Sequence, residues 1–150
     1  MTIKRALTFD DYRAIEGFLL LDSGETTALF MGRLFNALQA APERVACFQA
    51  WSDDGELKAF ILAQLEDPNG VWISQGWSHA DNPWEVANAL VDRVRLWAVA
   101  LGRTWVQART KRATRAMFER FGFVEVARVV EIKIDSQTAE RVYAAVKEPI

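Results

Sequence analysis

The chain has 150 residues, of which 51% are hydrophobic and 25% are charged, and its formal net charge is -2. This length fits one domain, and the composition excludes a disordered chain, while the acidic total argues against a protein that coats nucleic acid. No signal-peptide core or membrane-length apolar run is present, and one His with one Cys is too few for a structural zinc site. We therefore expect a cytoplasmic, metal-free single domain over residues 1–150.

The N-terminal part predicts one strand and two helices. Ile3–Leu7 forms a short strand, and Thr8 or Asp10 caps a helix. The apolar positions of that helix are Ile15, Phe18 and Leu19. A second helix runs from about Thr26 to Ala40, where apolar residues recur at a spacing of four, and Pro42 ends it.

Three strands joined by two turns follow. The strands are Val45–Trp51, Leu57–Leu65 and Val71–Trp77. Asp53-Asp54-Gly55 is a strong hairpin signal. Asp67-Pro68-Asn69-Gly70 is a second turn, in which Asn69 or Gly70 is free to adopt φ > 0. These elements predict an antiparallel meander.

The C-terminal half alternates helices and strands. Pro83 begins a long helix that ends at Gly102, a C′ glycine, and the strand Thr104–Ala108 follows. The inward stripe of the helix is Val86, Ala87, Leu90, Val91, Val94, Trp97 and Leu101. The last elements are a helix over Thr110–Phe121, a strand over Phe123–Ile134, and a tail after Ser136 that reads as either strand or helix. The order predicts an α/β (α+β) fold, a mixed sheet of about six or seven strands with about four helices on its two faces.

The segment Thr114–Phe123 carries the most specific motif. It resembles the penultimate helix of the GNAT N-acyltransferases, which commonly reads Asn-x-x-Ala-x-x-x-Tyr-x-x-x-Gly-Phe, and the order of elements resembles that family over nearly the whole chain. The resemblance implies a GNAT-like acyl-CoA N-acyltransferase. It implies that acetyl-CoA binds where the parallel strands Val71–Trp77 and Thr104–Ala108 diverge. The acceptor would be the amine of a small molecule, a protein N-terminus or a lysine.

The resemblance also implies where the cofactor binds. The family's pyrophosphate loop, Gln/Arg-x-x-Gly-x-Gly/Ala, falls on Asn82–Ala87, where only Ala87 matches. Glu85 stands at the central Gly, Pro83 lacks one N–H donor, and Phe118 aligns with a Tyr that often protonates the leaving thiolate. The predicted cofactor contacts are Trp77, Asn82, Trp84, Glu85, Val86, Ala87, Lys111, Arg112 and Phe118. These departures leave open a non-catalytic structural or interaction protein on the same scaffold, of the kind that phages and mobile elements encode.

Two residues are candidates for the general base. His79 follows the third meander strand, and histidine is the residue type that exchanges protons near neutral pH; the alternative is a solvated loop histidine. Glu66 ends the second meander strand, near where this family often carries a basic carboxylate. The neighbouring Asp67 is more simply a turn residue.

Three further features have two interpretations each. The basic run from Arg103 to Arg120 suits CoA phosphates, an acidic partner or nucleic acid, or is a solvated helix face. Trp77 and Trp84 line a pocket or an interface, including one between identical chains, or close the cleft apolarly. Cys47 lies in an apolar run and reads as a core residue rather than a reactive thiol.

Overall fold

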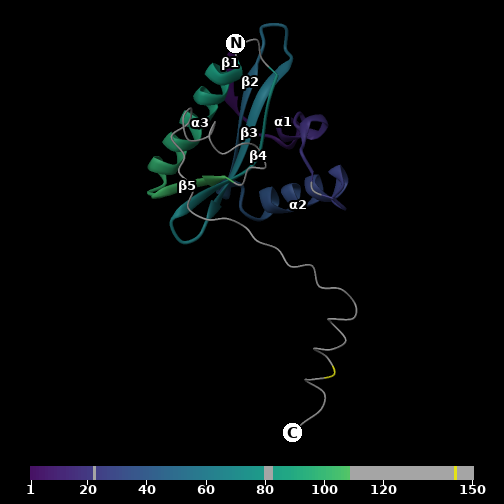
Figure 1. Ribbon diagram of the computed structural model, residues 1–150, viewed down its shortest axis with the longest axis vertical. Helices are drawn as coiled ribbons and strands as arrows, with labels where there is room; N and C mark the ends of the chain where they lie inside the picture. Colours follow the sequence, from purple (N-terminus) through teal and green to yellow (C-terminus); the bar gives the residue numbers. More distant parts are fainter. Residues whose placement is uncertain (22, 80–82, 109–143, 145–150) are drawn as a thin grey trace.

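The computed structural model describes residues 1–21, 23–79, 83–108 and 144. Figure 1 shows a twisted sheet with helices on its two faces. The strands are β1 (Thr2–Arg5), β2 (Val45–Trp51), β3 (Leu57–Glu66), β4 (Gly70–Ser78) and β5 (Trp105–Ala108). The helices are α1 (Phe9–Arg13), α2 (Thr27–Ala40) and α3 (Pro83–Ala100), with short 3-10 turns η1 (Glu16–Phe18) and η2 (Pro42–Arg44). None of the helices among the described residues has the length and hydropathy of a membrane span.

The strand order is β1-β2-β3-β4-β5, antiparallel from β1 to β4 and parallel between β4 and β5. This arrangement confirms the predicted mixed sheet and meander. The described residues contain five strands and three α-helices, fewer than expected for the whole chain. The elements expected at Thr110–Phe121, at Phe123–Ile134 and after Ser136 lie outside the described residues.

Alternation along β2 divides the core between the two faces of the sheet. Ala46 and Phe48 belong to the cluster beneath α3, where Val94 is fully buried. Cys47 belongs to the cluster on the opposite face, beneath α1 and α2 (Figure 1). Successive side chains of a strand point to opposite faces, so a strand covered on both sides is buried along nearly its whole length.

The first helix is shorter than the predicted one. Thr8 is its N-cap, in a capping box with Asp11, but α1 ends at Arg13 instead of continuing to Leu19. The N–H groups of Ala14 and Ile15 bond to carbonyls three residues earlier, which tightens the chain. The chain then passes into η1 with Ile15 fully buried.

The two turns of the meander differ in construction. Gly55 has φ 83° and confirms the predicted hairpin turn. The second turn is also present, with a cis Asp67–Pro68 peptide, and neither Asn69 nor Gly70 uses the positive φ that was open to it. Gly70 is small for another reason, because a Cβ there would overlap the indole of Trp105 on the neighbouring β5.

The end of α3 is as predicted except for one side chain. Gly102 has φ 70°, its N–H bonds to Val99 O, and the next N–H bonds to Ala98 O at 2.9 Å, which is a Schellman motif. Leu101 was expected inside, but its exposed fraction is 46% and Ala98 is buried instead. Leu101 follows the last residue of α3, where the helical period no longer applies.

Candidate functional site

A β-bulge divides β4 into two parts. Leu62 pairs with Gln75 and Ala63 pairs with Ile73, which leaves Ser74 as the extra residue. Only Gly70–Ile73, before the bulge, pairs with β5. Within the described chain, Ser74–Ser78 therefore has β3 as its only strand partner. A bulge bends its strand and ends regular pairing, so β4 can separate from β5 beyond Ser74.

The N-terminus of α3 follows this free part of β4. The first N–H groups of a helix have no partner within it and attract anions. Trp84 is 39% exposed and Glu85 is exposed, so their side chains lie at the surface. Val86 and Ala87 are half-buried and pack against the core beneath α3, so only their backbone can face a ligand. Asn82, also predicted to bind the cofactor, lies outside the described residues.

Trp77 faces away from α3. Its ring stacks on Phe18 of η1, with centroids 4.0 Å apart and planes at 22°, and it joins the core cluster beneath α1 and α2. The fold therefore does not bring Trp77 together with the N-terminus of α3. Trp77, which was predicted to contact the cofactor, instead packs against η1, the segment before α2.

The two predicted catalytic residues lie at opposite ends of the sheet. His79 is exposed just beyond β4, with its backbone N–H donating to Lys58 O at 2.7 Å and its ring 6.1 Å from that of Trp77. Glu66 pairs with Gly70 at the other end, about 26 Å away along β4 at 3.3 Å per residue. Glu66 and His79 therefore cannot act on one substrate atom, so at most one of these two candidates can be the general base.

Asp67, next to Glu66, is a structural residue as the turn pattern indicated. Arg44 at 3.0 Å and Arg103 at 3.3 Å both reach its carboxylate. Hydrogen bonds from Arg44 and then Arg103 hold the pKa of Asp67 below its usual value. Arg103 also donates to the carbonyls of Glu66 and Pro68, which ties the turn to the end of α3. Arg103, the first residue of the predicted basic run, therefore stabilises the fold.

Sequence reasoning missed one contact beside the bulge. Gln75 accepts a hydrogen bond from the N–H of Leu20 at 3.0 Å and donates one to the carbonyl of Leu20 at 2.8 Å. The two residues are 55 positions apart. A glutamine in a strand gives no local signal of such a partner, so only the fold could reveal the pair.

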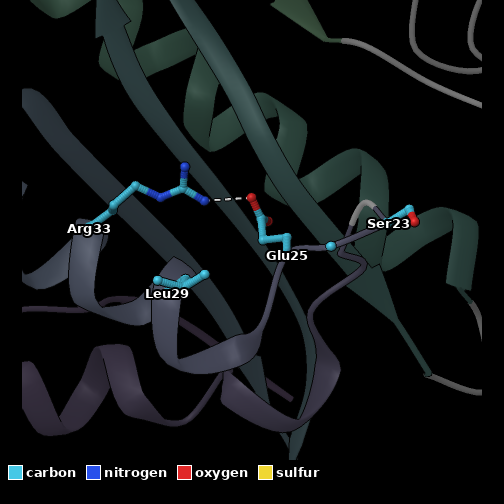
Figure 2. Close-up of a pocket in the computed structure, with 5 residues that line it drawn as sticks. Ser23, Glu25, Leu29 and Arg33 are labelled. Atoms are coloured by element: carbon cyan, nitrogen blue, oxygen red, sulfur yellow. Dashed lines mark hydrogen bonds and ion pairs between the residues drawn. The ribbon is translucent and has the colours of Figure 1, made fainter. Parts of the chain in front are cut away.

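A shallow pocket of about 350 Å³ lies in the segment that follows Leu20. It is lined by Ser23, Gly24, Glu25, Leu29 and Arg33. Figure 2 shows the Glu25 carboxylate and the Arg33 guanidinium facing each other above Leu29, joined as an ion pair. Glu25 is the more buried of the two, with 24% of its side chain exposed against 68% for Arg33.

Other predicted residues fall elsewhere. Cys47 is fully buried, and burial raises the pKa of its thiol to about 12, which confirms a core residue. Lys111, Arg112 and Phe118 lie outside the described residues. Among the residues that the structure describes, no group of three or more His, Cys, Asp or Glu side chains could hold a metal ion.

No protein-family model and no curated protein sequence matches the chain. Solved structures do match it. An aminoglycoside 6′-N-acetyltransferase from Acinetobacter haemolyticus has a TM-score of 0.69 at 19% identity, covering 90% of this chain and 100% of that one. Glucosamine-6-phosphate N-acetyltransferase from Arabidopsis thaliana has 0.65 at 14%, covering 90% and 100%. An aminoglycoside acetyltransferase in complex with a CoA-containing bisubstrate analogue has 0.68 at 18%, covering 90% and 99%. The element order and these likenesses show that the chain has the GNAT fold.

Proposed function

We propose that this protein transfers an acetyl group from acetyl-CoA to an amine of a small molecule. The observation that carries the proposal is the part of β4 beyond the bulge, Ser74–Ser78, which has β3 as its only strand partner among the described residues and ends beside the N-terminus of α3. A strand edge offers N–H and C=O groups to an extended ligand, and a helix N-terminus suits phosphate. The solved structures described above are those of acetyltransferases, and their likeness to this chain supports the same reaction.

The residues at this site fit most of the cofactor. The backbone of Ser74–Ser78 would hold its amide-bearing arm, and the hydroxyl of Ser78 is buried without a hydrogen-bond partner among the described residues. The first turn of α3 would hold the diphosphate, with Glu85 opposing it and Pro83 offering no donor. When bound, acetyl-CoA supplies an activated acyl thioester.

The acceptor amine would lose a proton as its nitrogen forms the amide bond, while the C–S bond of the thioester would break and CoA would leave as a thiolate that takes a proton from water. We propose that His79 accepts this proton. It follows β4 directly, at the end of the strand that leads to α3. Its exposed ring can pass the proton to water, and its neighbour Trp77 restricts where the ring lies. The pocket at Ser23–Arg33 would bind the acceptor, because the Glu25–Arg33 ion pair provides polar groups at its wall and Leu29 provides an apolar floor.

The second candidate is a non-catalytic interaction protein that retains this fold. Glu85 favours it, because a carboxylate in the first turn of α3 stabilises the helix and repels phosphate. Exposed Trp84, Leu96 and Val99 give α3 an apolar outer surface for a protein partner or a second copy of the chain. This candidate predicts self-association or a protein partner and no affinity for CoA.

Thermal unfolding with and without acetyl-CoA separates the two candidates. At 100 times the dissociation constant, binding adds about 2.7 kcal/mol, which raises the Tm of a chain of this size by about 5–10 °C. Adenosine and acetate are the control ligands in this binding assay. Activity is measured separately, by mass spectrometry, as acetylation of neamine or glucosamine 6-phosphate. His79→Gln should lower turnover without changing the shift in Tm. An unchanged Tm at millimolar acetyl-CoA would overturn the enzymatic proposal.

A further inference from the structure

Two side chains of β4 hold a segment that lies more than fifty positions earlier in the chain. Gln75 and Trp77 are two residues apart, so they point to the same face of the sheet. Gln75 makes its pair of hydrogen bonds to the backbone of Leu20, and Trp77 stacks on Phe18. The segment from Phe18 to Leu20 is therefore fixed on the part of β4 that lies beyond the bulge.

The hydrogen bonds carry more of this attachment at Leu20 than apolar burial does. The side chain of Leu20 is 65% exposed, so it contributes little buried area. The amide of Gln75 satisfies one N–H and one C=O of the backbone, as a neighbouring strand would. Removing that amide leaves this segment held by the stacking of Phe18 on Trp77 and by the packing of Leu19 against the same core cluster.

The attachment lies close to the acceptor pocket. Ser23 is three residues after Leu20, so at most about 10 Å of chain separates the hydrogen-bonded residue from the pocket lining. Gly24 has φ 84°, and Glu25 follows it directly. Glu25 is held on its other side by its ion pair with Arg33 of α2, so Leu20 and α2 anchor the two ends of the Ser23–Glu25 stretch.

We propose that Gln75 is a positioning residue for the acceptor. It holds Leu20, and through Leu20 it orients the Ser23–Glu25 side of the pocket relative to the free part of β4. This inference rests on the proposed acetyl transfer. Gln75 acts through the backbone and does not touch the reacting atoms. Acceptor affinity should therefore respond to Gln75, while the affinity for acetyl-CoA at the N-terminus of α3 should not.

Gln75→Met is the decisive variant, because it keeps the length of the side chain and removes both hydrogen bonds. Gln75→Glu keeps an acceptor for the Leu20 N–H but turns an anionic oxygen toward the Leu20 carbonyl. Gln64→Met is the matched control, since Gln64 is an exposed glutamine on neighbouring β3. Circular dichroism and urea unfolding establish that each variant is folded before other measurements.

The first measurement is backbone hydrogen exchange, which requires no activity. In Gln75→Met, exchange at Leu20 should accelerate about 10-fold, the effect of losing two exposed hydrogen bonds. Exchange at Leu29 and Phe30, whose N–H groups bond to Thr26 beside the pocket, should accelerate as well. Exchange in α3 should stay unchanged, and Gln64→Met should match the wild type. Acceleration confined to Leu20 would overturn the proposal, because the pocket would then be held independently.

The second measurement separates positioning from general stability. With neamine and glucosamine 6-phosphate as probe acceptors, Gln75→Met should raise the acceptor KM about 10-fold and leave the KM for acetyl-CoA within twofold. Gln75→Glu should raise the acceptor KM at least as much as Gln75→Met does. Equal changes in both KM values, or none, would overturn the positioning role. If the wild type acetylates neither amine nor binds acetyl-CoA, the proposed function fails, and hydrogen exchange alone decides whether Gln75 orders the pocket.

Discussion

Gly70 offers a direct test of how β4 and β5 are packed. Its backbone does not have positive φ, so alanine is conformationally allowed there. The obstacle is steric, since an added Cβ would overlap the six-membered ring of Trp105. That ring is the broad part of an indole and not the end of a flexible side chain. The pair also aligns the strands, because Gly70 and Trp105 are register partners.

We expect Gly70→Ala to destabilise the protein by about 2 kcal/mol, in the range found when an atom is added to a filled site. Gly76→Ala is the matched control in the same strand. Its Cβ would meet only the carbonyl of Phe60, at 3.8 Å, which is an ordinary contact. Alanine restricts the unfolded chain, so the control should be neutral or stabilising by up to about 1 kcal/mol.

Urea unfolding measures the difference between the two variants. With a dependence on denaturant of about 2 kcal/mol per molar, the midpoints of Gly70→Ala and Gly76→Ala should differ by about 1 M or more. Trp105→Leu removes the obstructing ring. In that background Gly70→Ala should cost at least about 1 kcal/mol less than it does alone. Equal midpoints for the two glycine variants, or an unchanged cost when Trp105 is absent, would refute the steric explanation.

Three other predictions concern single residues. Glu85→Gln should tighten acetyl-CoA binding about 5-fold at low salt and less at high salt, as measured by calorimetry, because it removes a charge that repels phosphate; a loss of affinity would contradict this role. Gly102→Ala should lower stability by about 1 kcal/mol in thermal unfolding, since its φ of 70° disfavours a Cβ, and an unchanged Tm would count against it. The pKa values of Cys47 and Tyr12 are both raised to about 12 by burial, so the folded state holds these protons while the unfolded state releases them near pH 9 and 10. The free energy of unfolding should therefore be highest below about pH 9 and should decrease toward pH 12. Cys47→Ala should make this decrease smaller. A free energy of unfolding that increases over this range would contradict the raised pKa values.

Local features could be predicted from the sequence because their interactions lie within a few residues. Gly55 and Gly102 have the positive φ that their turn and helix end require. The cap at Thr8 is likewise local, since its partner is Asp11. At Asn69 and Gly70 local reasoning gave the turn but not its conformation, since it left open a positive φ that neither residue adopts.

The candidate site could be predicted only in part. Its location beside the end of β4 and the start of α3 followed from the resemblance to GNAT proteins. The structure does not bring all the predicted members together, because Trp77 is engaged by Phe18 and Glu66 lies at the far end of the sheet. The sequence pattern could assign each residue to a strand, but it could not say which face or end of the sheet would meet which loop.

The sequence by itself determined the class of fold, the meander, and the limits of α3, since periodicity and turn residues act over short distances. Only the tertiary structure decided the bulge at Ser74, the packing of Trp105 over Gly70, and the pairing of Gln75 with Leu20. These contacts join residues 35 to 55 positions apart, or depend on strand register. Register and close packing are set by the whole core at once, and no short stretch of sequence contains that information.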